Sequence, residues 1–108
     1  MTMISEKNIK KMIVAKVEQG LNKLPKHLKE WSAEHLIKPR KIIFYSHLDI
    51  GEKDSAWLVT DHIGRRDSSY RVIYNKELDM FGLVVDLIGG TVHCLGYSGD
   101  FDKAIEGM

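Results

Sequence analysis

The first part of the chain repeats hydrophobic residues at the spacing of one face of an α-helix. The members of this repeat are Ile9, Met12, Ile13, Val17, Leu21 and Leu24. Ser5 precedes the repeat and is a typical N-cap residue, and Pro25 directly follows it. The pattern therefore predicts a first helix between these two residues. Gly20 lies within it and would weaken its last turn by about 1 kcal/mol relative to alanine.

A second helix is predicted over residues 25–36. Proline suits the first turn of a helix, because the N–H that it lacks would have no partner there. Leu28 and Trp31 would face the rest of the protein from this helix, and Pro39 would end it.

From Lys41 onward the period of the pattern changes from 3.6 to 2, which is typical of strands. Five runs are predicted as strands: residues 42–48, 56–63, 69–74, 80–88 and 91–97. The connections between them are short, and the Gly89-Gly90 pair is the strongest hairpin signal. These features favour an antiparallel meander. Trp57 and Phe81 are predicted to lie in the core.

Together the elements predict a single α+β domain over residues 1–108, with residues 1–40 helical, 41–97 forming the sheet and 98–108 a short C-terminal helix. The two N-terminal helices would cover one face of the sheet and leave the other face exposed. A hydrophobic fraction of 44% is ordinary for a globular chain of this length. A signal peptide and a membrane span are not predicted, because charged residues interrupt every apolar run, so we expect a cytoplasmic protein.

Charge is divided unevenly along the chain. Residues 1–41 hold 10 Lys/Arg against 4 Asp/Glu, a formal charge of +6, and residues 42–108 hold 6 against 11, a charge of −5. This division indicates either faces of opposite potential or the ordinary preference of helices for lysine and of turns for aspartate. Nucleic acid is not the expected partner, because no aromatic platform or glycine-rich RNA-binding signature accompanies the lysines.

The densest group of reactive side chains lies between the second and third predicted strands. His62, Asp67 and Arg66 would meet at a hairpin tip, where they could serve a small hydrolase or nuclease. Asp61 is adjacent to His62 in a strand, so the two side chains would point to opposite faces. A turn held by side-chain-to-backbone hydrogen bonds explains the same residues. We favour the turn and predict no catalytic residue.

No metal site or cofactor is predicted. His47, His62, His93 and Cys94 fall on or near strands, but neither a Cys-x-x-Cys nor a His-Glu-x-x-His spacing is present. Cys94 is the only cysteine, which excludes an intramolecular disulfide. It lies in an apolar strand, so we predict a buried core thiol and not a nucleophile.

Several segments resemble a family of short bacterial proteins of unknown function. The segments are WLVTDHIG at residues 57–64, DSSYRV at 67–72, FGL at 81–83, the GYxGxF pattern at 96–101 and EGM at 106–108. The resemblance extends to Glu30-Trp31 and to residues 34–37 and 39–40. It implies no catalytic residue. In size and α+β make-up the chain is also similar to immunity proteins, which bind and block bacterial toxins.

We therefore expect a non-enzymatic protein-binding domain, most concretely an immunity-type inhibitor of a bacterial toxin. The alternative is the hydrolase or nuclease described above. The predicted partner-binding residues are Asp61, His62, Arg66, Asp67, Tyr70, Tyr74, Glu77 and Asp79. A basic protein partner is expected, because it would face an acidic strand-and-turn region together with Tyr70 and Tyr74. The acidic residues of that region are Asp49, Glu52, Asp54, Asp61, Asp67, Glu77 and Asp79. A third hypothesis is a homodimer formed by edge-strand pairing or by stacking of the open sheet faces.

Overall fold

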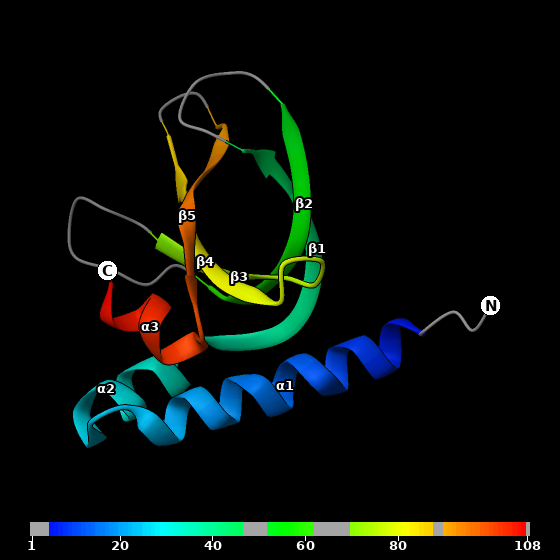
Figure 1. Ribbon diagram of the computed structural model, residues 1–108. Helices are drawn as coiled ribbons and strands as arrows, with labels where there is room; N and C mark the ends of the chain where they lie inside the picture. Colours follow the sequence, from blue (N-terminus) through cyan, green and yellow to red (C-terminus); the bar gives the residue numbers. More distant parts are fainter. Residues whose placement is uncertain (1–4, 47–51, 62–69, 88–89, 108) are drawn as a thin grey trace.

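Five strands follow one another around a closed barrel, and the helices gather at one side of it (Figure 1). The computed structural model describes residues 5–46, 52–61, 70–87 and 90–107. The helices are α1 (Glu6–Lys23), α2 (Lys26–Ala33) and α3 (Phe101–Glu106). The strands are β1 (Leu36–Tyr45), β2 (Lys53–Thr60), β3 (Tyr70–Asn75), β4 (Met80–Asp86) and β5 (Val92–Gly99). The predicted α+β class is confirmed, since helices precede and follow an antiparallel sheet along the chain.

Helix α1 begins where the sequence predicts. The Ser5 hydroxyl accepts a hydrogen bond from the Asn8 amide at 3.3 Å and caps the helix. The helix continues past Gly20 to Lys23, and the glycine is buried. A Cβ at this position would lie 2.6 Å from the Cβ of Phe101, so glycine allows α1 and α3 to pack closely.

The predicted boundary between helices and sheet is wrong. Helix α2 ends at Ala33, and β1 begins at Leu36, so Pro39 lies inside a strand and does not end a helix. Proline cannot donate to a strand ladder and is tolerated in a sheet at irregular positions. The pairing of β1 with β2 shifts register between Leu36 and Arg40, which is where this proline stands.

The predicted meander is confirmed, since each strand pairs antiparallel with the next one in the chain. Its closure was not predicted. Strand β1 meets β5 in parallel at Tyr45 and His93, as an odd number of up-and-down strands requires. Closure turns one face of all five strands toward a common interior.

The barrel interior is filled by hydrophobic side chains from every strand. The buried members are Phe44, Ala56, Leu58, Ile73, Val84 and Cys94. Tyr97 joins them because it stands opposite Gly82, where a Cβ would approach its ring to 2.7 Å. Cys94 is 6% exposed, which confirms the predicted core thiol, and burial raises the pKa of that thiol.

A larger cluster fills the layer between the helices and the outer face of β2, β3 and β4. The strand members are Trp57, Val59, Val72, Tyr74, Phe81 and Leu83. They pack against α1 through Ile13 and Val17 and against α3 through Phe101. The predicted burial of Trp57 and Phe81 is confirmed. The expected sheet with one covered and one exposed face is wrong, because the interior buries one face and the helices cover part of the other.

Candidate functional site

The predicted partner-binding residues do not form one surface. His62, Arg66 and Asp67 lie outside the described residues, and so does the hairpin tip on which the hydrolase alternative depends. The structure places the remaining five residues of the prediction in four different environments. Those environments, taken in turn, show which of the five are available to a partner.

Asp61 lies at the end of β2 and is paired with His35. Its Oδ1 is 2.6 Å from Nδ1 of the imidazole, and its amide donates to the His35 carbonyl at 2.9 Å. The edge of the Trp31 ring packs on the same imidazole, with ring centroids 5.8 Å apart. These contacts fasten the junction of α2 and β1 to β2, so the described partner of Asp61 comes from the helical half of the chain.

Tyr74 and Asp79 lie together beneath helix α1. Tyr74, predicted as a partner-binding residue, is only 1% exposed, and its hydroxyl donates to Asp79 Oδ1. Lys16 Nζ lies 3.0 Å from the same carboxylate oxygen. Burial, followed by the hydrogen bond to Asp79, raises the pKa of Tyr74. The hydrogen bond from Tyr74, supported by Lys16, lowers the pKa of Asp79.

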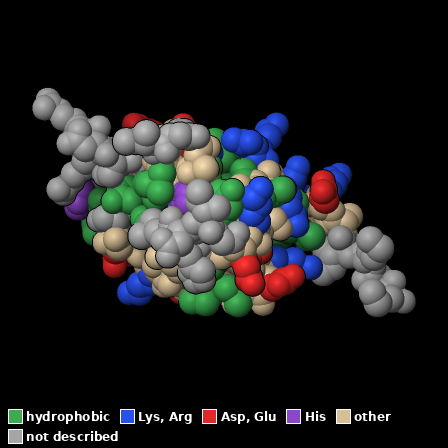
Figure 2. Space-filling model, turned by 90° about the horizontal axis from the view of Figure 1, so that it is seen from above, with side chains coloured by type: hydrophobic (Ala, Val, Ile, Leu, Met, Phe, Trp, Pro, Cys, Tyr) green, Lys and Arg blue, Asp and Glu red, His purple; other side chains and the backbone are tan. Residues whose placement is uncertain are grey.

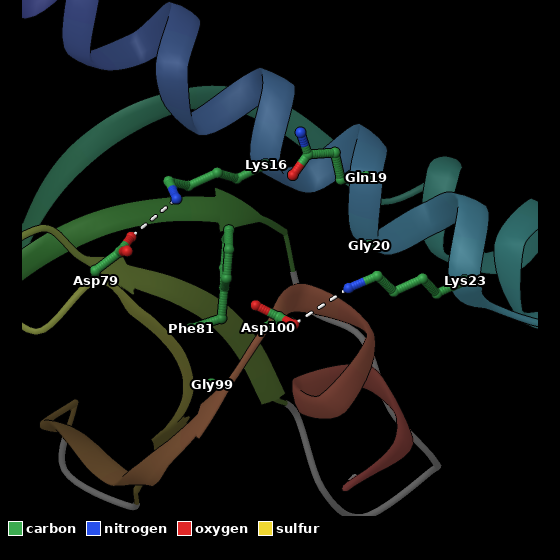
Figure 3. Close-up of a pocket in the computed structure, with 8 residues that line it drawn as sticks. All are labelled: Lys16, Gln19, Gly20, Lys23, Asp79, Phe81, Gly99 and Asp100. Carbon is green, nitrogen blue, oxygen red and sulfur yellow. Dashed lines mark hydrogen bonds and ion pairs between the residues drawn. The ribbon is translucent and has the colours of Figure 1, made fainter.

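Figure 3 shows a small cleft beside this group, with two lysines of α1 reaching toward the barrel. Lys16 is paired with Asp79. Two helical turns further along α1, Lys23 Nζ lies 3.2 Å from Asp100 Oδ2. The cleft has a volume of about 50 Å³. Because both of its carboxylates are already paired with lysines, we interpret the cleft as part of the helix attachment.

Tyr70 and Glu77 lie on two separate hollows. Tyr70 is half-buried and lines a depression of about 260 Å³ together with Leu83 and Leu95. Glu77 is exposed in the turn between β3 and β4 and borders a groove of about 330 Å³ that reaches Trp57. Asp61 and Asp79 are also 57% and 63% exposed despite their ion pairs, so among the described residues of the prediction only Tyr74 is shielded from a partner.

A surface that the sequence did not single out lies on the outer side of β1 and β2. We call it the β1–β2 face. Its three successive cross-strand pairs are Lys41 with Trp57, Ile43 with Ser55, and Tyr45 with Lys53. Ile43, in the middle pair, is 69% exposed and is the most exposed large hydrophobic side chain among the described residues. Figure 2, which views the molecule from above, shows hydrophobic side chains next to lysine and arginine side chains on the visible surface.

The first and third pairs of the β1–β2 face are cation–aromatic contacts. Lys41 Nζ lies 5.3 Å from the centre of the Trp57 ring, and Lys53 Nζ lies 5.4 Å from that of Tyr45. Such contacts contribute about 0.5–1 kcal/mol at exposed sites. They also hold the two lysine side chains over the sheet, on either side of Ile43.

The groove at Trp57 continues from the β1–β2 face. Lys41 and Ser55 belong to both surfaces, and the groove extends between the start of α1 and the turn after β3. Its apolar part is formed by Ile9, Ala56 and Trp57. Its charged lining consists of Glu6, Asp54, Glu77, Lys41 and Lys76. A volume of about 330 Å³ is at the lower end of the range found for ligand pockets.

The β1–β2 face combines one exposed aliphatic side chain with two cations. An exposed aliphatic side chain between two cations can bury apolar area and attract acidic groups. Within the described residues no group of three or more His, Cys, Asp or Glu is placed to hold a metal ion. In the same part of the chain, no helix is both long and apolar enough to cross a membrane.

A signal for this face is present in the sequence. Residues 42–45 read Ile-Ile-Phe-Tyr and are apolar on both faces of the strand. A strand of that kind is either buried on both sides or presents one apolar side to a partner. The choice depends on where the helices lie, which the pattern does not reveal.

Comparison with protein-family models found no match for this chain, and comparisons with curated proteins and with solved structures found none either.

Proposed function

We propose that this protein acts by binding another protein through its β1–β2 face. The observation that carries the proposal is the 69% exposure of Ile43 on a regular, well-paired part of the barrel. Fully burying an isoleucine side chain contributes about 1.5–3 kcal/mol. Because Ile43 is exposed in the isolated chain, a partner that buries it would gain this stabilisation.

The surroundings of Ile43 support binding over ordinary surface variation. The side chain does not stand alone, because Lys41 and Lys53 are held beside it by aromatic rings and the Trp57 groove opens next to it. Protein interfaces combine a central apolar anchor with a polar and charged rim, which is the arrangement of this face. The strands that carry it are rigid elements of the barrel, so little order has to be gained on binding.

The finer form of the proposal is inhibition of a bacterial toxin. It rests on the similarity of size and α+β make-up to immunity proteins, and the partner would then be a toxin domain. An inhibitor of this kind needs a preformed docking surface and no catalytic group, which is compatible with the β1–β2 face.

The test is co-expression with the products of the neighbouring genes in the source genome, followed by affinity purification. We expect one product to co-purify with the native chain and not with Ile43→Asp. The new carboxylate would lie at the centre of the contact and would lose its water there without gaining a hydrogen bond or an opposite charge. If that product arrests growth when expressed alone, co-expression of the native chain, but not of the variant, should restore growth.

Val14→Asp is the matched control. Val14 is 44% exposed on α1, so it tests the same chemical change on another exposed hydrophobic residue. It should retain the partner. Recovery of the same product with native chain and Ile43→Asp would exclude the β1–β2 face, and failure of every neighbouring product to bind would remove the support for toxin inhibition.

A further inference from the structure

We infer that the partner presents an acidic, extended segment in which carboxylates flank an apolar side chain. This inference rests on the proposed function and adds the chemistry of the partner. It reverses the charge expected from the sequence, where a set dominated by acidic residues pointed to a basic partner.

The charge of the two strands supports an acidic partner. The three outward pairs of the β1–β2 face hold two cations, Lys41 and Lys53, and no carboxylate. Asp54 is the one acidic residue of β1 and β2, and it stands opposite Phe44, whose side chain lies in the barrel interior. Because side chains alternate along a strand, Asp54 does not belong to the outward row. The β1–β2 face is therefore cationic.

The order and spacing of the cations and Ile43 on the face indicate which side chains the partner's segment should carry. Lys41 and Ile43 lie two residues apart on β1, and Lys53 stands opposite Tyr45, two residues further on. At about 3.3 Å per residue, the row from cation to cation is about 13 Å long, with Ile43 at its centre. An extended segment with the order acidic, apolar, acidic at alternate positions has the same spacing, so each of its side chains meets a complementary group.

A protein segment fits this face better than single-stranded nucleic acid. Proteins that bind single strands offer aromatic rings on which bases stack. Here Trp57 is 3% exposed and Tyr45 is stacked on His93, with ring centroids 5.1 Å apart. The exposed group between the lysines is the aliphatic side chain of Ile43, which matches an apolar side chain of a protein.

The experiment titrates the ¹⁵N-labelled full chain with two short synthetic peptides and follows amide chemical shifts. In one peptide Glu and Leu alternate, and in the other Gln replaces each Glu. We expect the acidic peptide to shift amides of residues 41–45 and 53–55, to bind more weakly as salt is raised, and to bind about tenfold or more tightly than the neutral peptide.

Two double variants test the assignment. Lys41→Glu with Lys53→Glu should abolish binding of the acidic peptide, whereas Lys26→Glu with Lys103→Glu, which makes the same charge change at exposed helical positions, should preserve it. Amide dispersion in the spectrum of each variant verifies that it is folded. Equal binding of both peptides, no binding of either, or shifts away from residues 41–45 and 53–55 would overturn the inference.

A single-stranded DNA oligonucleotide is the third probe. Shifts at the same residues that are stronger than those from the acidic peptide would assign the face to nucleic acid and overturn the inference. The inference and the proposed function fail separately. Loss of a co-purified partner in Ile43→Asp, together with equal binding of the two peptides, refutes only the inference.

Discussion

The outer surface of the barrel consists of two regions that share one backbone architecture and differ in what covers them. On one region, Val59, Val72 and Phe81 are buried under α1 and α3. On the other, Ile43 stands on an equally regular strand and is 69% exposed. Strand pairing and alternation are similar in both, so the position of the helices, and not the hydrophobicity of the strand, decides which apolar side chains stabilise the fold and which remain available to a partner.

Removing a large side chain from each region should give the largest contrast. Phe81 is 3% exposed and packs against Tyr74 and Phe101, with ring centroids 4.9 and 5.6 Å away. Phe81→Ala should lower the free energy of unfolding by about 3–5 kcal/mol. Ile43→Ala should change it by no more than about 0.5 kcal/mol. Urea unfolding followed by circular dichroism measures both, and similar losses would break the comparison.

The contact between α1 and α3 offers a sharper test of the covered region. Gly20→Ala improves helix propensity but places a methyl group against Phe101, so we expect a net loss of about 1–3 kcal/mol. Ala15→Gly, at an exposed position of the same helix, should cost about 1 kcal/mol through propensity alone. An increase in stability with Gly20→Ala would show that the two helices are not in close contact.

The polar edge of the covered region can be tested through Tyr74. Tyr74→Phe removes the hydroxyl that donates to Asp79 and should cost about 1 kcal/mol at neutral pH. The folded-state pKa of Asp79 is lowered, so its contribution is present above the unfolded value of about 3.9 and disappears as the pH falls through the folded value. The difference between native chain and variant should therefore shrink in acid.

Unfolding at neutral pH and near pH 2 checks this sign. The carboxyl carbon of Asp79, followed by NMR, should titrate at a higher pH in Tyr74→Phe than in the native chain, because Lys16 alone then favours the ionised form. A difference that grows in acid would contradict the assignment of the hydrogen bond.

The smallest effect is expected from the ion pairs that join α1 to the barrel. Lys16 and Lys23 are 33% and 57% exposed, so Lys16→Gln and Lys23→Gln should each cost about 0.2–1 kcal/mol. Raising the salt concentration should reduce both losses. A cost that does not depend on salt would show that packing of the lysine stems, and not charge, attaches the helix.

Much of the architecture could be predicted because it depends on local rules. The 3.6-residue repeat and the Ser5 cap specify α1, and the change to alternation specifies five consecutive strands. The error at Pro39 is instructive. Proline indicates a helix end in isolation, yet the register shift of β1 against β2 accommodates it within a strand. That accommodation depends on a neighbouring strand distant in sequence.

The candidate site was only partly predictable for the same reason. Tyr74 has the same phase as Val72 in its strand, and both are buried against the helices, where the Tyr74 hydroxyl is bonded to Asp79. Asp61 adjoins His62 in the sequence, yet its described partner is His35, which lies 26 positions earlier. Contacts between residues far apart in the chain determined which of the predicted side chains are available.

Hydrophobic period, caps and turns act over a few residues, and they specify the order and type of the elements but not the boundary between α2 and β1. Contacts between distant parts of the chain specify that β1 meets β5 and that α1 and α3 lie over β2, β3 and β4. Closure buries one face of every strand, and the helices are too few to cover all of the other. Ile43 is exposed for that reason, and no pattern within β1 distinguishes it from a buried residue.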